Sequence, residues 1–342
     1  MRACRRATLT AMNFELRPIP SLSIVVPAYN EIENVGNVCA RVAQVLSATG
    51  VDDWELIFSV DPSSDGTEDA IRQLALTESR IKLIRFSRKV GQPAATIAGM
   101  AASTKDACVV IDCDLQDPPE LIADLVQGYR EGYDVVYAQR RTREGETVIK
   151  RAVASLGYSV IGKIAEVDIP KNTGDFRLMS RRVVAEVVAL GESHGFLKGL
   201  VPYVGFPTTG VQYDRAAREA GASKYNRFWG SLLIGLNGVI GFSRYPLQLI
   251  SISGLILALL AIVVAITYTA LKIAGVDFPA GNVTIVVVVS FFSGVQLLSI
   301  GIMGEYVGRI YDEVKRRPKW IVESQTGLSR EAVEQLDELR WR

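Results

Sequence analysis

Two aspartates spaced two residues apart are the clearest chemical signal in the sequence. Asp112 and Asp114 follow a short apolar run, and on an extended backbone residues i and i+2 point to the same side. Two neighbouring carboxylates repel each other unless a cation neutralises them. Oxygen ligands favour a hard divalent ion, Mg²⁺ or Mn²⁺, which keeps open positions for phosphate oxygens. The pair therefore predicts a divalent metal site that meets a phosphorylated substrate.

Other polar segments also follow apolar runs. They contribute Pro27, Tyr29, Glu31, Asp61 and Asp65. An isolated pair of spaced aspartates would fit a solvated turn equally well, but three acid-bearing segments of this kind favour a binding site. Gln116 falls on the same side as the aspartate pair, where it can touch a ligand; a simple loop role is the alternative.

Basic and hydroxyl side chains at several positions could bind an anionic group. The candidates are Arg140, Arg141, Arg143, Arg177, Lys198, Ser223 and Lys224. Arginine suits this task because its planar guanidinium makes bidentate contacts with phosphate oxygens. For the arginines at positions 140–143, a solvated loop is the alternative.

Several classes of protein are excluded or disfavoured. No G-x-G-x-x-G or G-x-x-x-x-G-K-[ST] motif is present, which disfavours dinucleotide-binding enzymes and P-loop NTPases. With 38 Lys and Arg against 37 Asp and Glu, the net charge is +1, so we expect no nucleic-acid partner. His194 is the single histidine, which argues against a His-based triad or metal site. The four cysteines show no C-x-x-C pair and are expected to be free thiols.

The elements that must position these residues alternate in type. We expect strands at residues 22–27, 55–60, 81–86, 108–112 and 134–138, with amphipathic helices at 34–48 and 68–76. Such alternation predicts an α/β domain with a mainly parallel, Rossmann-like sheet. Ligands of such sheets bind at the carboxyl ends of the strands, where the polar segments fall.

Two long uncharged runs follow this region. Residues 246–271 and 278–304 contain no charged side chain, and about 20 apolar residues suffice to cross a bilayer. Lys and Arg flank the two runs on their outer sides, whereas the connecting loop holds one Lys and one Asp. The positive-inside rule then predicts a multi-pass protein of the cytoplasmic membrane with both termini and the catalytic domain in the cytoplasm.

These observations divide the chain into seven parts. We expect a mobile leader (1–20), a catalytic domain (21–226), an interfacial amphipathic helix (227–245), a first transmembrane helix (246–271), an external loop (272–282), a second transmembrane helix (283–304) and a cytoplasmic C-terminal tail (305–342).

Five ordered motifs resemble a known family. They are the PAYNE segment, the Asp61 and Asp65 pair, the DCDLQDPPE segment, the GDFRL segment around Asp175, and the GASKY segment around Lys224. Together they resemble the family 2 glycosyltransferases with a GT-A fold, and more narrowly the polyprenyl-phosphate glycosyltransferases. That group includes bacterial bactoprenol glucosyltransferases and dolichol-phosphate mannose synthases. The resemblance spans about residues 21–323.

The resemblance implies an enzyme that transfers a hexose from a nucleotide sugar, UDP-glucose foremost, to a membrane polyprenyl phosphate with inversion. Pro27, Tyr29, Glu31 and Asp61 match nucleotide-binding positions, while Asp112 and Asp114 match the metal and diphosphate positions. Asp175 matches the proposed catalytic aspartate, with Arg177 beside it. The acceptor phosphate is already ionised, so Asp175 acts either as a base or as a positioning and electrostatic group. A homo-oligomer such as a tetramer is also implied.

Two segments depart from the family pattern. Asp61-Pro62 stands where Asp-Gly is common, and Lys89-Val90-Gly91-Gln92 stands where Asn-x-Gly is common. The alternatives are the same chemistry with GDP-mannose or another nucleotide sugar, a processive polysaccharide synthase, and a non-catalytic membrane scaffold or flippase.

Overall fold

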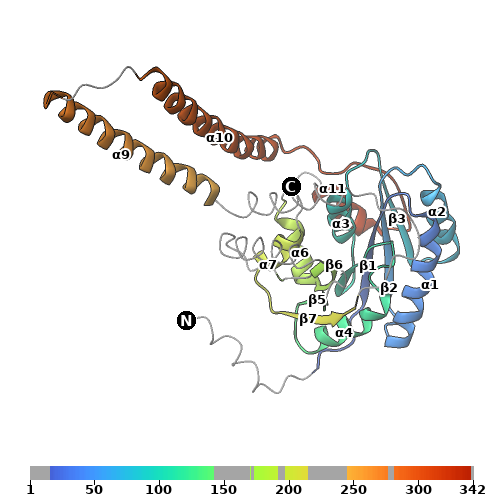
Figure 1. Ribbon diagram of the computed structural model, residues 1–342. Helices are drawn as coiled ribbons and strands as arrows, with labels where there is room; N and C mark the ends of the chain where they lie inside the picture. Colours follow the sequence, from blue (N-terminus) through green and yellow to red (C-terminus); the bar gives the residue numbers. More distant parts are fainter. Residues whose placement is uncertain are drawn as a thin grey trace. The chain divides into compact units, whose positions relative to one another are not determined.

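The computed structural model describes residues 16–141, 170, 173–191, 197–214, 245–275 and 281–339. They divide into two units, one built around a sheet and one made of two long apolar helices (Figure 1). The predicted interfacial helix at residues 227–245 lies outside the described residues except for its last position.

The described residues of the first unit form one eight-stranded sheet. Its strands are β1 (Leu22–Ala28), β2 (Trp54–Val60), β3 (Ile81–Phe86), β4 (Ala107–Val110), β5 (Val135–Arg140), β6 (Thr173–Ser180), β7 (Thr208–Tyr213) and β8 (Val322–Thr326). The strand order is β7-β5-β6-β4-β1-β2-β3-β8. Only β6 and β8 run against the other six strands, so the sheet is mixed but mainly parallel.

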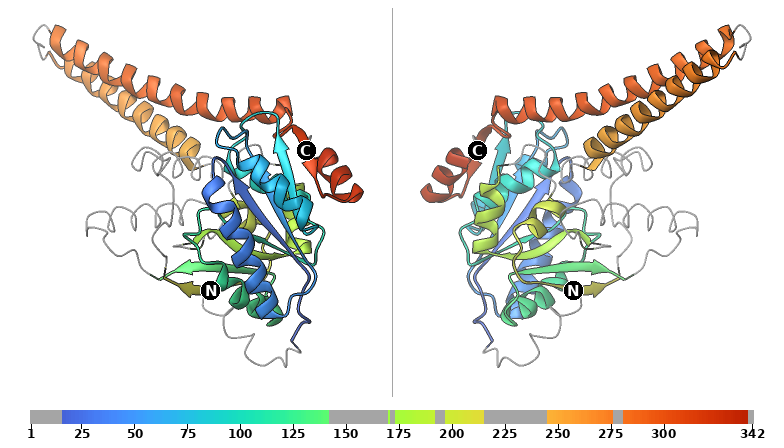
Figure 2. Two further views of the ribbon diagram at one scale, coloured as in Figure 1. Left: turned by 90° about the vertical axis from the view of Figure 1, so that its right-hand side faces the viewer. Right: turned by 90° about the vertical axis from the view of Figure 1, so that its left-hand side faces the viewer.

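Helices cover both faces of this sheet (Figure 2). On one face lie α1 (Ile32–Thr49), α2 (Thr67–Thr77) and α4 (Ile122–Arg130), with the short 3-10 helix η1 (Pro119–Leu121) before α4. On the other lie α3 (Gln92–Ala101), α6 (Arg181–Ala189) and α11 (Arg330–Leu339), with α7 (Leu197–Tyr203) beside α6. Every residue of β1 and β2 is buried, as expected for central strands covered on both faces.

The structure confirms the predicted fold class and each predicted strand to within two residues at either end. Both predicted amphipathic helices are also present, as α1 and α2. Strands β6, β7 and β8 were not predicted.

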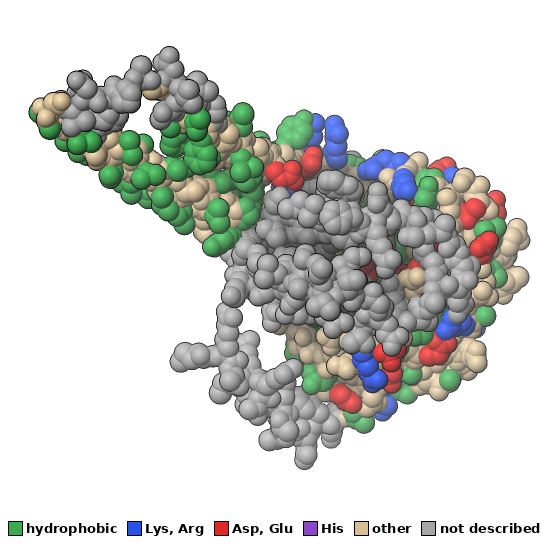
Figure 3. Space-filling view, viewed as in Figure 1, with side chains coloured by type: hydrophobic (Ala, Val, Ile, Leu, Met, Phe, Trp, Pro, Cys, Tyr) green, Lys and Arg blue, Asp and Glu red, His purple; other side chains and the backbone are tan. Residues whose placement is uncertain are grey.

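The second unit holds α9 (Tyr245–Ile273) and α10 (Asn282–Lys315). Both are long and apolar enough to cross a membrane, with mean hydropathies of 3.0 and 1.9 over Tyr245–Leu271 and Val287–Lys315. Hydrophobic side chains gather over these two helices in the space-filling view (Figure 3). The two predicted spans fall inside them, although α10 continues past position 304 to Lys315.

The structure shows contacts at both chain ends that the sequence did not predict. The last residues of the predicted mobile leader are fixed, because Arg17 donates hydrogen bonds to the Gly132 carbonyl (2.8 Å) and the Asp134 carboxylate (3.4 Å). The predicted C-terminal tail contributes β8 and α11 to the first unit from Arg316 onward. Pairing with β3 and packing on α3, which no local pattern reveals, make it part of the sheet domain.

Candidate functional site

The loops at the carboxyl ends of β1 and β2 are joined by hydrogen bonds. The Asn30 N–H donates to Ser63 Oγ (3.1 Å), and the Ser64 N–H donates to Asn30 Oδ1 (2.9 Å). Asn30 adopts a φ of 52°, a left-handed conformation that asparagine tolerates better than most residues. The two polar segments after β1 and β2 therefore form one connected surface.

The segment after β4 alternates between buried and half-buried positions. Asp112, Asp114 and Gln116 are half-buried, while the intervening Cys113 and Leu115 are buried. This segment lies beyond the end of β4 and is not extended, since Leu115 adopts a φ of 54°. Desolvation by burial raises the pKa of the Cys113 thiol, so this cysteine acts as a small apolar packing residue.

The loop between β3 and α3 connects the ends of β2 and β4. Asp61 is 3% exposed, and its two carboxylate oxygens accept the N–H groups of Val90 (2.8 Å) and Gly91 (3.0 Å). Gln92 Nε2 donates to Asp112 Oδ1 at 2.8 Å. Residues 90–92 thus link Asp61, a predicted nucleotide-binding residue, to Asp112, a predicted metal ligand. In the sequence, this segment stood out only because it departs from the family pattern.

Two predicted nucleotide-binding residues have contacts within the fold. Pro27 is buried within β1. Asp65 accepts hydrogen bonds from the Ile32 N–H (3.1 Å) and from the N–H and hydroxyl of Thr67 (3.0 and 2.6 Å). Desolvation acts to raise the pKa of Asp65, but these hydrogen bonds hold it below its ordinary value. Asp65 therefore fixes the starts of α1 and α2.

Asp175 and Arg177 lie in β6 with different surroundings. The Asp175 side chain is 30% exposed, whereas that of Arg177 is 1% exposed. The Arg177 guanidinium donates to the carbonyls of Gly174 (2.8 Å), Asp175 (3.2 Å) and Leu197 (3.3 Å). Its NH2 also lies 3.6 Å from Asp175 Oδ1. Arg177 thus holds the backbone that carries Asp175, while Asp175 itself can reach a ligand.

A buried network stands next to this pair. Asp117 is 1% exposed and accepts hydrogen bonds from the Tyr213 hydroxyl and from Arg140 NH2 (3.4 Å to each oxygen). Burial and the Asp117 carboxylate raise the pKa of Tyr213 to about 12, so the phenol stays protonated as a donor. A Cβ at Gly174 would stand 3.0 Å from Arg140 NH2, so the network reaches the residue before Asp175. Neither Asp117 nor Tyr213 was among the residues predicted from the sequence.

The remaining predicted phosphate-binding residues are dispersed or undescribed. Arg141 is exposed, with NH1 3.9 Å from Asp214 Oδ2. Lys198 is half-buried in α7. Arg143, Ser223 and Lys224 lie outside the described residues, as does His194. Tyr29 and Glu31 are half-buried after β1, where they were expected.

The donor set suits a divalent ion that shares its coordination with a substrate. Within the described ranges, no group of three or more His, Cys, Asp or Glu side chains is arranged to hold a metal. Asp112 and Asp114 supply two half-buried carboxylates close together in the chain. Mg²⁺ commonly binds in this way, through one or two carboxylates, water and substrate phosphates. The residues present therefore fit the predicted Mg²⁺ or Mn²⁺.

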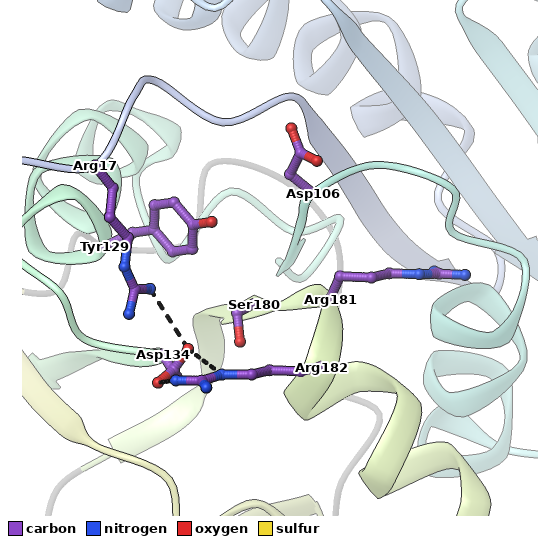
Figure 4. Close-up of a pocket in the computed structure, with 7 residues that line it drawn as sticks. All are labelled: Arg17, Asp106, Tyr129, Asp134, Ser180, Arg181 and Arg182. Atoms are coloured by element: carbon purple, nitrogen blue, oxygen red, sulfur yellow. Dashed lines mark hydrogen bonds and ion pairs between the residues drawn. The ribbon is translucent and has the colours of Figure 1, made fainter.

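A cavity of about 410 Å³ lies at the opposite ends of the strands (Figure 4). Asp134, just before β5, is 1% exposed there and is paired with Arg17 and Arg182. Desolvation acts to raise the pKa of Asp134, but the hydrogen bonds and charge of Arg182 and the charge of Arg17 hold it below its ordinary value. None of the predicted site residues lines this cavity, which is built around the ion pairs of the buried Asp134 with Arg17 and Arg182.

The described cysteines are free thiols, as predicted. Cys39 is half-buried, and Cys108 and Cys113 are buried. Burial raises the pKa of both Cys39 and Cys108 to about 12. Cys4 lies outside the described residues.

The chain matches both a family model and individual known proteins. The family model described as glycosyl transferase family 2 matches residues 23–188. An uncharacterized glycosyltransferase of Synechocystis sp. is 42% identical, covering 92% of this chain and 99% of the relative. A SfII prophage-derived bactoprenol glucosyl transferase of Shigella flexneri is 37% identical, covering 88% of this chain and 97% of the relative.

Among solved structures, a mannosyltransferase of Pyrobaculum calidifontis in complex with GDP-Man and Mn²⁺ covers 89% of this chain and 92% of its own. It is 16% identical with a TM-score of 0.46, which is too low to support a functional comparison.

A mainly parallel, mixed sheet with carboxylates grouped in the loops after its central strands defines a Rossmann-like GT-A domain. The chain belongs to glycosyl transferase family 2 and is a transferase enzyme.

Proposed function

We propose that this enzyme transfers glucose from UDP-glucose to the phosphate of a membrane polyprenol, with inversion at the sugar. The observation that carries the proposal is the 37% identity to a bactoprenol glucosyl transferase over 97% of its length. The grouped carboxylates at the strand ends and the two long apolar helices fit a charged sugar donor and a lipid acceptor.

The donor site would be formed by the loops after β1, β2 and β4. Tyr29, Glu31 and Asp61 would bind the nucleoside, with Gln116 near the sugar or the diphosphate. Asp112 and Asp114 would hold Mg²⁺ or Mn²⁺, which when bound neutralises charge on a leaving nucleoside diphosphate. Each of these side chains follows a strand of the parallel core, where ligands of such sheets bind.

The acceptor side would use Asp175 and basic residues. An ionised phosphate needs no obligatory general base, so Asp175 acts either as a base or as a positioning and electrostatic group. Arg140, Arg141, Arg143, Lys198, Ser223 and Lys224 remain the proposed phosphate contacts. Arg140 is the best anchored of those described, because Asp117 and the Tyr213 hydroxyl (3.1 Å from Nε) fix its guanidinium.

We further propose the domain division predicted from the sequence, with its C-terminal part revised as above, a cytoplasmic active site and a homo-oligomer such as a tetramer. GDP-mannose or another nucleotide sugar is the second candidate donor. A processive synthase is disfavoured because its Gln-x-x-Arg-Trp signature is not matched: Gln335 is followed by Arg340-Trp341 at a different spacing. Gln335 also lies in α11, where it accepts a hydrogen bond from Arg181 (3.2 Å). Membership of a transferase family argues against a scaffold or a flippase.

Full-length protein in detergent with Mn²⁺, a short polyprenyl phosphate and a panel of labelled nucleotide sugars tests the proposal. We expect a glycolipid from UDP-glucose. Asp112→Asn and Asp114→Asn should each lower turnover by about 100-fold or more, because the leaving diphosphate loses its neutralising ion. Asp124→Asn, an exposed position in α4, is the matched control and should stay within about twofold.

The absence of glycolipid with every nucleotide sugar would refute the proposed reaction. Transfer from GDP-mannose but not from UDP-glucose would instead change the assigned donor. Full activity of both aspartate variants would remove the metal assignment.

A further inference from the structure

The β3–α3 loop, residues 87–91, contacts the side chains that the proposed function assigns to the sugar donor. Its Val90 and Gly91 N–H groups hold both carboxylate oxygens of Asp61. A carboxylate fixed by two backbone N–H groups must move with the backbone that carries them. The position of Asp61 is therefore set by this loop.

Two further contacts extend the control of this loop. Lys89 Nζ lies 3.6 Å from the centroid of the Tyr29 ring, a cation–π distance. Gln92, the first residue of α3, donates to Asp112 at 2.8 Å. One short segment thus touches residues that follow β1, β2 and β4.

Gly91 adopts a backbone conformation that other parts of the fold must stabilise. Its φ of +86° with a ψ of 159° is accessible almost only to glycine. A glycine also leaves the backbone free to adopt other conformations. Neighbouring elements must hold the loop in this one.

The C-terminal segment, residues 316–339, holds the loop at its start. Strand β8 pairs with β3 so that Val322 opposes Phe86, the last residue before the loop. The Ser87 N–H donates to the Ile321 carbonyl at 2.9 Å. Arg88 NH2 lies 3.4 Å from the carbonyls of both Pro318 and Lys319.

The same segment also holds the end of the loop. Helix α11 packs against α3, which begins at Gln92. Ala332 and Leu336 of α11 are 0% and 2% exposed. Trp320, which precedes β8, is among the largest fully buried side chains of the described residues. Both flanks of the loop are therefore braced by chain that follows α10.

We infer that residues 316–339 act as a positioning element for the nucleotide-sugar donor, through the β3–α3 loop. Arg88 and Leu336 are positioning residues that touch no substrate. Through the β3–α3 loop they keep the side chains of Asp61, Asp112 and Tyr29 in position. This inference rests on the proposed function. It places the control of donor affinity in chain that directly follows the second apolar helix.

Steady-state kinetics of full-length Arg88→Ala and Leu336→Ala test this inference, with the donor that the wild-type enzyme uses. We expect the KM for the nucleotide sugar to rise about fivefold or more, with kcat and the KM for polyprenyl phosphate within about twofold of wild type. The Kd for UDP in the presence of Mn²⁺ should rise in parallel. Arg88→Lys should recover part of the affinity, because an ammonium can still reach one carbonyl.

Glu334→Ala, on the exposed side of α11, is the matched control and should behave as wild type. Variants that lower the melting temperature while donor KM and UDP affinity stay unchanged would overturn the inference, because the brace would then serve stability alone. If Leu336→Ala does not fold, the comparison of Arg88→Ala with Arg88→Lys tests the inference. Arg88 is exposed, so neither substitution should prevent folding. A wild-type enzyme that binds no nucleotide would refute the proposed function instead.

Discussion

The buried cation Arg177 fixes the backbone that carries Asp175. Its guanidinium is fully buried and is satisfied by three backbone carbonyls, two of which belong to Gly174 and Asp175. A buried cation is tolerated only when its donors are paired in this way. These hydrogen bonds therefore fix the backbone of the partly exposed Asp175.

Substitution of Asp175 should mainly affect turnover, whereas substitution of Arg177 should mainly affect stability. Asp175→Asn should lower turnover by roughly 100-fold with only a small fall in melting temperature, since the three backbone carbonyls still satisfy the buried Arg177 when the carboxylate 3.6 Å away is neutralised. Arg177→Lys should destabilise the protein by about 2 kcal/mol, because lysine cannot satisfy three carbonyls at once. Turnover and thermal melting separate these effects.

Arg72→Lys, at a partly exposed position of α2, serves as the control for the second substitution. Equal losses of stability in Asp175→Asn and Arg177→Lys would contradict the division of roles.

Asp134 gives a pH-dependent prediction. Its pKa is held below the ordinary value, so ionised Asp134 stabilises the fold above about pH 4, and this stabilisation is lost as pH falls through the lowered pKa. Asp134→Asn should cost roughly 1–3 kcal/mol at pH 7, and the difference from wild type should shrink below about pH 4. Melting temperatures across this range provide the measurement, and a constant difference would contradict the ion-pair assignment.

At the scale of elements, α3 lies unusually close to the sheet. A Cβ added at Gly99 would stand 2.4 Å from Val25 Cγ1 and 2.5 Å from Ser59 Oγ. Only glycine allows this approach, and α3 carries at its start the Gln92 that contacts Asp112. Close packing of the helix thus fixes where the loop after β3 ends.

Gly99→Ala should therefore push α3 away from β1 and β2. We expect a loss of about 1–3 kcal/mol, the usual cost of overpacking, and a lower melting temperature. Gly36→Ala in α1 is the matched control, because nothing lies within 4 Å of its added Cβ. That change should stabilise the protein by up to about 1 kcal/mol through helix propensity. A neutral Gly99→Ala would show that the helix can shift freely.

Prediction of the elements succeeded where the pattern was local. Strands β1 to β5 are apolar runs bounded by polar segments, so they could be located from the sequence. Strand β6 carries Asp175 and Arg177, and β8 is the short run VESQT. Neither has an apolar run, because β6 contains charged residues with specific partners and β8 gains its stability by pairing with β3, far away in the chain.

At the scale of the whole molecule, the chain leaves the sheet domain before α9 and re-enters it at Arg316. Because β8 pairs with β3, both ends of the α9–α10 segment are attached to the same domain. Any membrane that these helices cross must be crossed an even number of times. This supports the proposed hairpin topology independently of the positive-inside rule.

Thiol labelling of bacterial cells tests the topology. In a Cys4→Ser background, a membrane-impermeant reagent should label Gly275→Cys, beyond α9, in intact cells. Glu331→Cys, exposed on α11, should react only after permeabilisation. The three remaining native thiols are buried or half-buried with raised pKa values, so they should react slowly. Labelling of both positions from the same side would contradict the hairpin.

The sequence by itself determined the fold class, the apolar helices and the acid-bearing strand ends, because each follows from residue types spaced along a few consecutive residues. It also indicated the family through five short motifs. Only the tertiary structure showed the contacts that these residues make. Asp65 accepts a hydrogen bond from the Ile32 N–H, the Arg177 guanidinium donates to the Leu197 carbonyl, and the chain after α10 pairs with β3, because the fold brings together partners that lie far apart in the sequence.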